Sequence, residues 1–158
     1  MKSHLLQIRA QNQHGVLGKV TNLLRRRMFN IEGLTAGATE QNGISHITVE
    51  ISKTENFSAE QAKKQLSKII ETINVRDVDE HFITREIALF RIHFSQKNKT
   101  EILALPQMTN AKIIACEKKS IVVEFAGLPS EIDNFYELVK NFGVSEFTRS
   151  SVIAIRKG

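Results

Sequence analysis

Hydrophobic residues in the first part of the chain follow two different periods. Residues 2–10 have the length of one strand, and the polar run 11–13 ends it. From Gly15 onward the apolar positions change to the spacing of a helix, at Val16, Leu17, Val20, Leu23 and Leu24. Three consecutive arginines, 25–27, close this helix, where cations complement the exposed carbonyl groups. The pattern predicts a strand followed by a helix.

Two more strands, a helix and a further strand are predicted up to residue 78. Residues 29–36 and the alternating positions 47, 49 and 51 indicate two strands, and Asn42-Gly43 between them is typical of a tight turn. Ser58 and Gln61 form a possible capping box. The helix that follows has its apolar positions at Ala62, Leu66, Ile69, Ile70 and Ile73. A short strand near 74–78 completes this half.

The second half repeats the order of the first. Its predicted elements are a long strand 83–94, a helix 97–105 ended by Pro106, a hairpin of 112–116 and 120–126, a helix opened by Ser130 and Asp133, and the last strand or strands within 144–155. Each half therefore indicates β-α-β-β-α-β, the ferredoxin-like order. The expected fold is α+β, with two such domains, residues 1–79 and 80–158, and antiparallel sheets covered by helices on one face. The other face is left open, so we expect copies of the chain to pair.

Composition narrows the setting of the protein. The 158 residues are 41% hydrophobic and 25% charged, as in globular proteins. No apolar run approaches the roughly 20 residues of a membrane-spanning helix, and no signal peptide is evident, so no membrane partner is expected. The single cysteine, Cys116, excludes an internal disulfide or a thiolate metal cluster. These features favour the cytoplasm.

Catalytic and nucleic-acid signatures are missing from the sequence. The five histidines have no metal-ligand spacing, and there is no nucleophile elbow or glycine-rich phosphate loop. The net charge of +5 is spread evenly over both halves. Strands 45–51 and 120–126 offer only Phe125 for stacking on RNA bases. We therefore expect neither an enzyme with its own active site nor a nucleic-acid-binding module.

The loop between the first strand and the first helix is a candidate binding site. A helix N-terminus presents unpaired N–H groups, and Gly15 permits close approach, so a carboxylate could bind there with help from the Asn12 amide. The equally weighted alternative is that Asn12 and Gly15 merely shape the turn and bind no ligand. Asn30 lies between apolar Phe29 and Ile31 and needs a partner, which a ligand, a second subunit or water could supply.

Four segments together resemble one known family. Asn12-x-x-Gly15-Val16-Leu17, followed by residues 27–35, resembles the ACT domain of the small subunit of acetolactate (acetohydroxyacid) synthase. Residues 84–89 and 142–150 resemble the opening and closing motifs of that family's C-terminal domain. The resemblance covers essentially the whole chain.

The resemblance implies a non-catalytic regulatory subunit. Such a subunit activates a large catalytic subunit, which uses thiamine diphosphate, Mg²⁺ and FAD, and confers feedback inhibition by valine in the biosynthesis of valine, isoleucine and leucine. The small subunit itself would hold no cofactor. An alternative is a free-standing ACT-type amino-acid sensor that acts on another enzyme or regulator.

The family pattern also implies an effector site and a homodimer. ACT domains typically pair side by side and bind the amino acid between them. Carried over by motif, the valine-binding residues are Asn12, His14, Gly15, Val16, Leu17, Asn30 and Ile31, with Asn30 contributed by the other protomer. His14 stands where the family usually has a small residue or proline, and Gly18 where it often has Ser or Ala.

Overall fold

The structure is a computed structural model that describes residues 3–53, 58–96 and 98–158. Residues 2 and 97, with which two predicted elements begin, lie outside these ranges. The chain forms two compact units, the first made of residues 1–84 and 151–158 and the second of residues 85–150. The sequence predicts domains of residues 1–79 and 80–158, and in this division by contacts residues 80–84 and 151–158 lie with the first unit.

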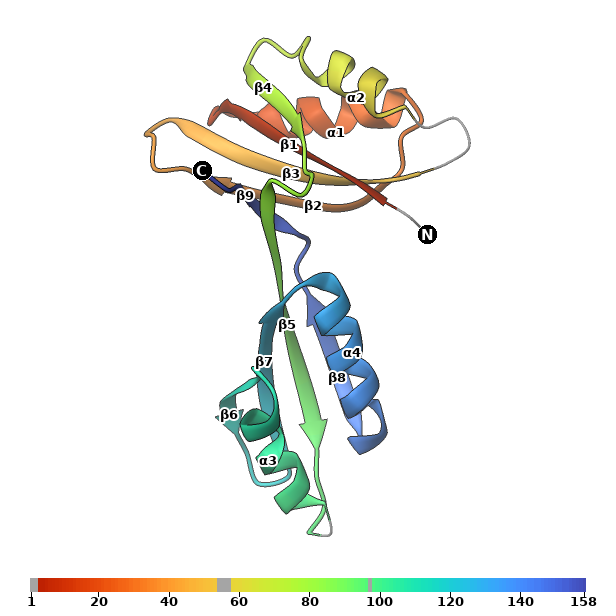
Figure 1. Cartoon of the computed structure of the whole chain (residues 1–158), viewed down its shortest axis with the longest axis vertical. Coiled ribbons are helices and arrows are strands. Elements are labelled where there is room, and N and C mark those ends of the chain that lie inside the picture. The colour runs from red at the N-terminus through yellow and green to blue at the C-terminus, as the bar shows by residue number, and fades with distance from the viewer. Residues whose placement is uncertain (1–2, 54–57, 97) are drawn as a thin grey trace. The chain divides into compact units, whose positions relative to one another are not determined.

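The first unit contains one antiparallel sheet and two helices. In chain order its elements are β1 (Ser3–Gln11), α1 (Val16–Arg26), β2 (Ile31–Ala38), β3 (Ile44–Ser52), α2 (Ala59–Leu66) and β4 (Thr72–Asp77). The strands lie in the order β2-β3-β1-β4, and both helices cover the same face of the sheet (Figure 1). This is the ferredoxin-like arrangement that the sequence predicts.

Alternation along the central strands builds the core of this unit. Leu6 and Ile8 of β1 are fully buried, and they lie opposite Val49 and Ile47 of β3. Because side chains alternate between the two faces of a strand, these residues share the face that meets the helices. The helices contribute buried Val16, Val20, Leu24, Ala62 and Leu66.

The last residues of the chain lie on the opposite face of the same sheet, where the sequence predicted an open surface. β9 (Ile153–Arg156) pairs with β5 (Phe82–His93), and Figure 1 shows it on the side away from α1 and α2. Gln7 Nε2 donates to the Ala154 carbonyl oxygen at 2.6 Å. A Cβ added at Gly33 would lie 2.2 Å from Ser151 Oγ, so a larger residue there would force the Ser151 side chain to move.

The second unit repeats the arrangement. After β5 come α3 (Lys99–Met108), β6 (Lys112–Cys116), β7 (Ser120–Gly127), α4 (Pro129–Val139), the short 3₁₀ helix η1 (Lys140–Phe142) and β8 (Val144–Arg149), with strand order β6-β7-β5-β8. Phe90 at the centre of its core is fully buried and packs edge-on against Phe135, with ring centroids 5.0 Å apart. Among the described residues, no helix is long and apolar enough to cross a membrane.

Two helix ends differ from the sequence prediction. α2 stops at Leu66, although the apolar spacing continues to residue 73. The chain instead turns so that Ile69 enters the core, Ile70 is 93% exposed and Ile73 joins β4. α3 continues past Pro106 to Met108, so this proline lies in the last turn of the helix instead of following its end.

Candidate functional site

Two neighbouring turns hold the loop between β1 and α1. The Gln11 N–H donates to the Glu71 carbonyl oxygen at 2.9 Å, and the Asn12 N–H donates to the Gly43 carbonyl oxygen at 2.8 Å. Gly43 has φ +76° and belongs to the predicted Asn-Gly turn. Neither contact was predictable from the sequence, because both use backbone atoms whose pairing no residue type reveals.

Helix α1 begins with an open N-terminus. Gly15 precedes it in the left-handed region, with φ +81°, and its carbonyl oxygen accepts the Lys19 N–H at 2.9 Å to close the first turn. No side chain caps this end, and its first turn has no acidic residue. The Val16 N–H makes a long contact of 3.4 Å to the Gln13 carbonyl oxygen. The N–H groups of the next two residues lie too early in the helix for an intrahelical acceptor, so an anion can take that place.

Five of the predicted site residues meet at this helix end. The side chains of Asn12 and His14 are exposed and make no hydrogen bond within the described part of the chain. Leu17 is 42% exposed. The Val16 side chain is buried in the core, so Val16 offers only its backbone to a ligand. A Cβ added at Gly15 would meet no atom within 4 Å. The space in front of the helix is therefore free.

The remaining two predicted residues lie at the opposite end of α1. Its 11 residues span about 16 Å, which separates Asn30 and Ile31 from Gly15. The Asn30 amide donates to Glu32 Oε1 and to Ser52 Oγ, both at 3.0 Å, so its partners come from within the chain. Ile31 is half-buried against the core. One chain alone does not bring these two residues to the helix N-terminus.

Charged groups near the site are few and paired. Lys19 forms an ion pair with Glu71, and this hydrogen bond holds the pKa of the Glu71 carboxyl below its usual value. The described residues contain no group of three or more side chains that could hold a metal ion.

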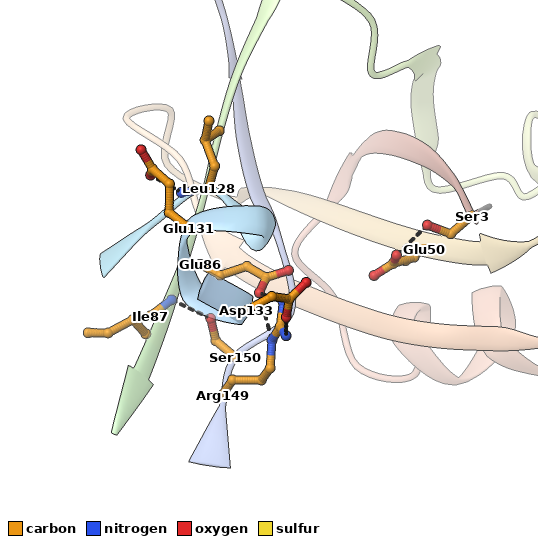
Figure 2. A network of polar contacts seen from close by, with 9 residues as sticks. All are labelled: Ser3, Glu50, Glu86, Ile87, Leu128, Glu131, Asp133, Arg149 and Ser150. Atoms are coloured by element: carbon orange, nitrogen blue, oxygen red, sulfur yellow. Dashed lines mark hydrogen bonds and ion pairs between the residues drawn. The ribbon is translucent and has the colours of Figure 1, made fainter. Parts of the chain in front are cut away.

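A separate polar network lies inside the second unit and is drawn in Figure 2. Glu86 is 5% exposed and accepts two hydrogen bonds from Arg149, one of them from Nε at 2.8 Å. Arg149 also donates to Asp133 Oδ1 at 2.7 Å. Burial disfavours the charged guanidinium, but the two carboxylates outweigh burial and raise the pKa of Arg149. The sequence analysis missed Glu86, because its partner is 63 residues away.

Comparison with known proteins defines the class and then the family. Residues 6–74 match the model of the AHAS small subunit-like ACT domain, and residues 85–158 match that of the small subunit of acetolactate synthase. The chain is thus an ACT-domain protein with a second ferredoxin-like unit.

Relatives agree with these matches along the full length of the chain. A probable acetolactate synthase small subunit from Archaeoglobus fulgidus is 34% identical, over 98% of this chain and 97% of its own. The acetolactate synthase small subunit of Bacillus subtilis is 32% identical, over 98% and 90%. The crystal structure of the acetolactate synthase small subunit from Thermotoga maritima has a TM-score of 0.89 at 30% identity, covering 100% of this chain and 99% of that one. The chain belongs to the acetolactate synthase small-subunit family.

Proposed function

We propose that this chain is the regulatory subunit of an acetolactate synthase, which activates the catalytic large subunit and makes it sensitive to valine. The family match over the full length of the chain supports the large subunit as its partner. The main observation that supports the regulatory role is the uncapped N-terminus of α1, which follows Gly15 in a domain that matches the family model of an ACT domain. This end of the helix suits the carboxylate of an amino acid.

The proposed effector site has a polar and an apolar part. The valine carboxylate accepts the free N–H groups at the start of α1, and the Asn12 amide, which is exposed and otherwise unused, adds a further donor. The exposed Leu17 gives the isopropyl group an apolar contact. Full burial of such a group contributes about 1.5–3 kcal/mol. His14 borders the same space, so it limits the size of the ligand.

A second copy of the chain completes this site. Within the described residues β2 is an edge strand whose one neighbour is β3, and an edge strand offers free backbone groups for pairing. Two copies related by a two-fold axis with their α1 helices antiparallel place Asn30 and Ile31 of one copy near Gly15 of the other. The dimer then has two equivalent sites. Because ligand bound between copies stabilises their association, valine and dimerisation are linked by mass action.

Catalysis belongs to the large subunit in this proposal. Thiamine diphosphate, Mg²⁺ and FAD are assigned to that subunit, which condenses the 2-keto acids at the start of branched-chain amino-acid synthesis. This chain contributes the sensor and holds none of these cofactors. We place the complex in the cytoplasm, where the single exposed thiol of Cys116 stays reduced.

Turnover of the purified large subunit tests the proposal. Adding this chain should raise the turnover to a plateau, and L-valine should then inhibit only the mixture. L-aspartate serves as the control amino acid. Turnover that stays unchanged at saturating chain would contradict the proposal. If the chain nevertheless binds valine, that result would favour the free-standing sensor.

A further inference from the structure

A groove separates α1 from the end of α2 in the first unit. Two adjoining hollows of about 810 and 360 Å³ form it, and they share Leu23 and Arg26. On one side the groove follows α1 from Gly15 to Arg27, and on the other it is lined by Gln65 and residues 68–71. With a rise of 1.5 Å per residue, this path is about 18 Å long.

The lining of the groove is strongly cationic. Its basic residues are Lys19, Arg25, Arg26, Arg27 and Lys68, and its one carboxylate, Glu71, is paired with Lys19. The three arginines are exposed, and within the described residues they form no ion pair. Cations at a helix C-terminus complement its dipole, which explains part of this cluster. That effect does not explain Lys68, which lies across the groove and outside α1.

An apolar contact point accompanies these charges. Ile70 lines the groove and is 93% exposed, whereas the adjacent Ile69 is buried in the core. Gly18 lies on the opposite wall, and a Cβ added there would meet nothing within 4 Å. The groove thus combines a row of cations with one exposed aliphatic side chain, a mixture found at protein interfaces.

These features favour a protein segment as the occupant. None of the lining residues is aromatic, so the groove offers no platform on which nucleic-acid bases could stack. Arg25, Arg26 and Arg27 are consecutive at the C-terminal end of α1, Lys68 lies across the groove, and Lys19 lies about two turns earlier on α1. Cations spread over this length suit an elongated chain better than a small anion. Charge complementarity requires that chain to be acidic.

We propose that the groove between α1 and α2 binds an acidic segment of the catalytic large subunit. This inference rests on the proposed function, because it assumes that partner. The groove runs away from the start of α1 toward its C-terminus, so the partner segment and the effector touch the same helix. The docking surface and the effector site nevertheless use different side chains, which lets each be tested separately.

The test measures the affinity of the full-length chain for the purified large subunit at low and high salt. In the groove variant, Arg25, Arg26 and Lys68 are changed together to Glu. The matched control changes Lys112, Lys118 and Lys119 to Glu, which is the same charge change on exposed residues of the second unit. We expect the groove variant to bind about tenfold more weakly at about 50 mM salt, with a smaller difference at about 300 mM, because salt screens exposed charges. The control should stay within about twofold of wild type.

A variant with neutral side chains controls for a loss of binding that is caused by unfolding. Glutamate near a helix C-terminus disfavours the helix, so Arg25→Gln, Arg26→Gln and Lys68→Gln are also combined. This variant should keep valine binding and still lose about threefold or more in affinity for the large subunit. Wild-type affinity in both groove variants, or an equal loss in the control, overturns the inference.

Two other outcomes are distinguishable. If wild type binds and activates the large subunit and the groove variants do the same, the groove assignment fails while the proposed function stands. If wild type neither binds nor activates, both fail. A labelled single-stranded RNA is the probe for the other macromolecule. RNA binding that the groove variants lose, with unchanged affinity for the large subunit, also overturns the inference.

Discussion

The two units share one fold but differ in whether an acidic side chain or a cap lies at the N-terminus of the first helix. In the second unit Glu101 lies in the first turn of α3, and the Glu131 carboxylate accepts the Leu128 N–H at 2.6 Å at the start of α4. In the first unit α2 has Ser58 as its cap and Glu60 in its first turn, whereas α1 has neither an acid in its first turn nor a side-chain cap. An acid at a helix start occupies the position that an external anion would take. Among the four α-helices of the described residues, the N-terminus of α1 is therefore the one best suited to bind an anionic ligand.

Arg149 in the second unit and the arginines at the end of α1 in the first unit show a second difference. In the second unit Arg149 is engaged by buried Glu86 and by Asp133 (Figure 2). In the first unit three arginines at the end of α1 lie exposed along a groove. A buried ion pair is costly to break by removing one partner, whereas charges left at the surface are available to other molecules. A duplicated fold can thus keep one copy as a scaffold and use the other for recognition.

The largest effect we predict concerns the internal network of the second unit. Arg149→Met leaves the Glu86 carboxylate buried without its partner, so the unit should lose about 3–5 kcal/mol of stability. The combined Glu86→Met and Arg149→Met variant should recover most of this loss. Urea unfolding followed by the fluorescence of Tyr136, the only tyrosine and a residue of α4, measures both. Asp133→Asn is the control, since this exposed partner contributes only about 0–1 kcal/mol. An Arg149→Met loss no larger than the Asp133→Asn loss would show that the network is not a scaffold.

Substitutions at two helix ends should have smaller effects on stability, and the two effects should have opposite signs. Met28 after α1 has φ +59° and is 89% exposed, whereas Gly143 after η1 has φ +92°. Because left-handed backbone costs a residue with a Cβ about 1–2 kcal/mol, Gly143→Ala should destabilise the second unit by about that amount. Met28→Gly should stabilise the first unit by about 0.5–1 kcal/mol, since it relieves strain without loss of packing. Thermal unfolding of both variants measures the pair, and equal signs would refute the explanation.

Asn12→Ala should weaken valine binding while the chain stays folded. Loss of one hydrogen bond to the ligand corresponds to about 1 kcal/mol, or about fivefold in affinity. Gln13→Ala, at the exposed neighbouring position, should change the affinity by less than about twofold. Valine inhibition of the reconstituted enzyme provides the readout, and identical curves for the two variants would exclude Asn12 from the site.

The smallest predicted effect is a dependence of stability on pH in the first unit. Burial, together with the nearby Arg9 guanidinium, holds the pKa of His46 below its ordinary value. A lowered pKa in the folded state means that the unfolded chain binds the proton more readily. Stability from His46 is therefore present above about pH 6.5 and decreases as pH falls through the folded-state pKa.

Titration of the histidine ring protons by NMR measures this directly. The pKa of His46 should lie below about 6.5, and His46→Gln should reduce the loss of stability between about pH 7 and 5.5. His93→Gln, a change at an exposed histidine of the second unit, should leave that loss in place. A His46 pKa above the ordinary value would contradict the prediction.

Local patterns were sufficient to predict most of the fold. Alternation at Ile47, Val49 and Ile51 marked β3, and the Asn42-Gly43 turn preceded it as expected. The end of α2 could not be predicted, because Ile69, Ile70 and Ile73 continue the helical spacing although only the first enters the core. The packing of residues 151–158 against the first unit was equally hidden, since strand periodicity does not reveal what a strand packs on, and β9 still pairs with β5 of the second sheet.

The candidate site was predictable only in part. Gly15 and the helix start were visible, because the change from strand to helix spacing and a glycine mark that position. The carbonyl contacts of Gly43 and Glu71 that hold the loop had no signal in residue type. The partners of Asn30 in its own chain, Glu32 and Ser52, depend on the register of β2 with β3, which the sequence did not give.

A calorimetric titration with L-valine tests the central claim that the N-terminus of α1 holds the effector carboxylate. The chain is titrated as wild type, Gly15→Asn and Gly15→Asp. Asn and Asp have the same size and both tolerate the left-handed backbone at this position, so they differ mainly in charge. We predict measurable valine binding by Gly15→Asn and a further loss of about 2 kcal/mol or more, about 30-fold in affinity, in Gly15→Asp, because its carboxylate takes the ligand's place. Equal valine affinities for the two variants would contradict it.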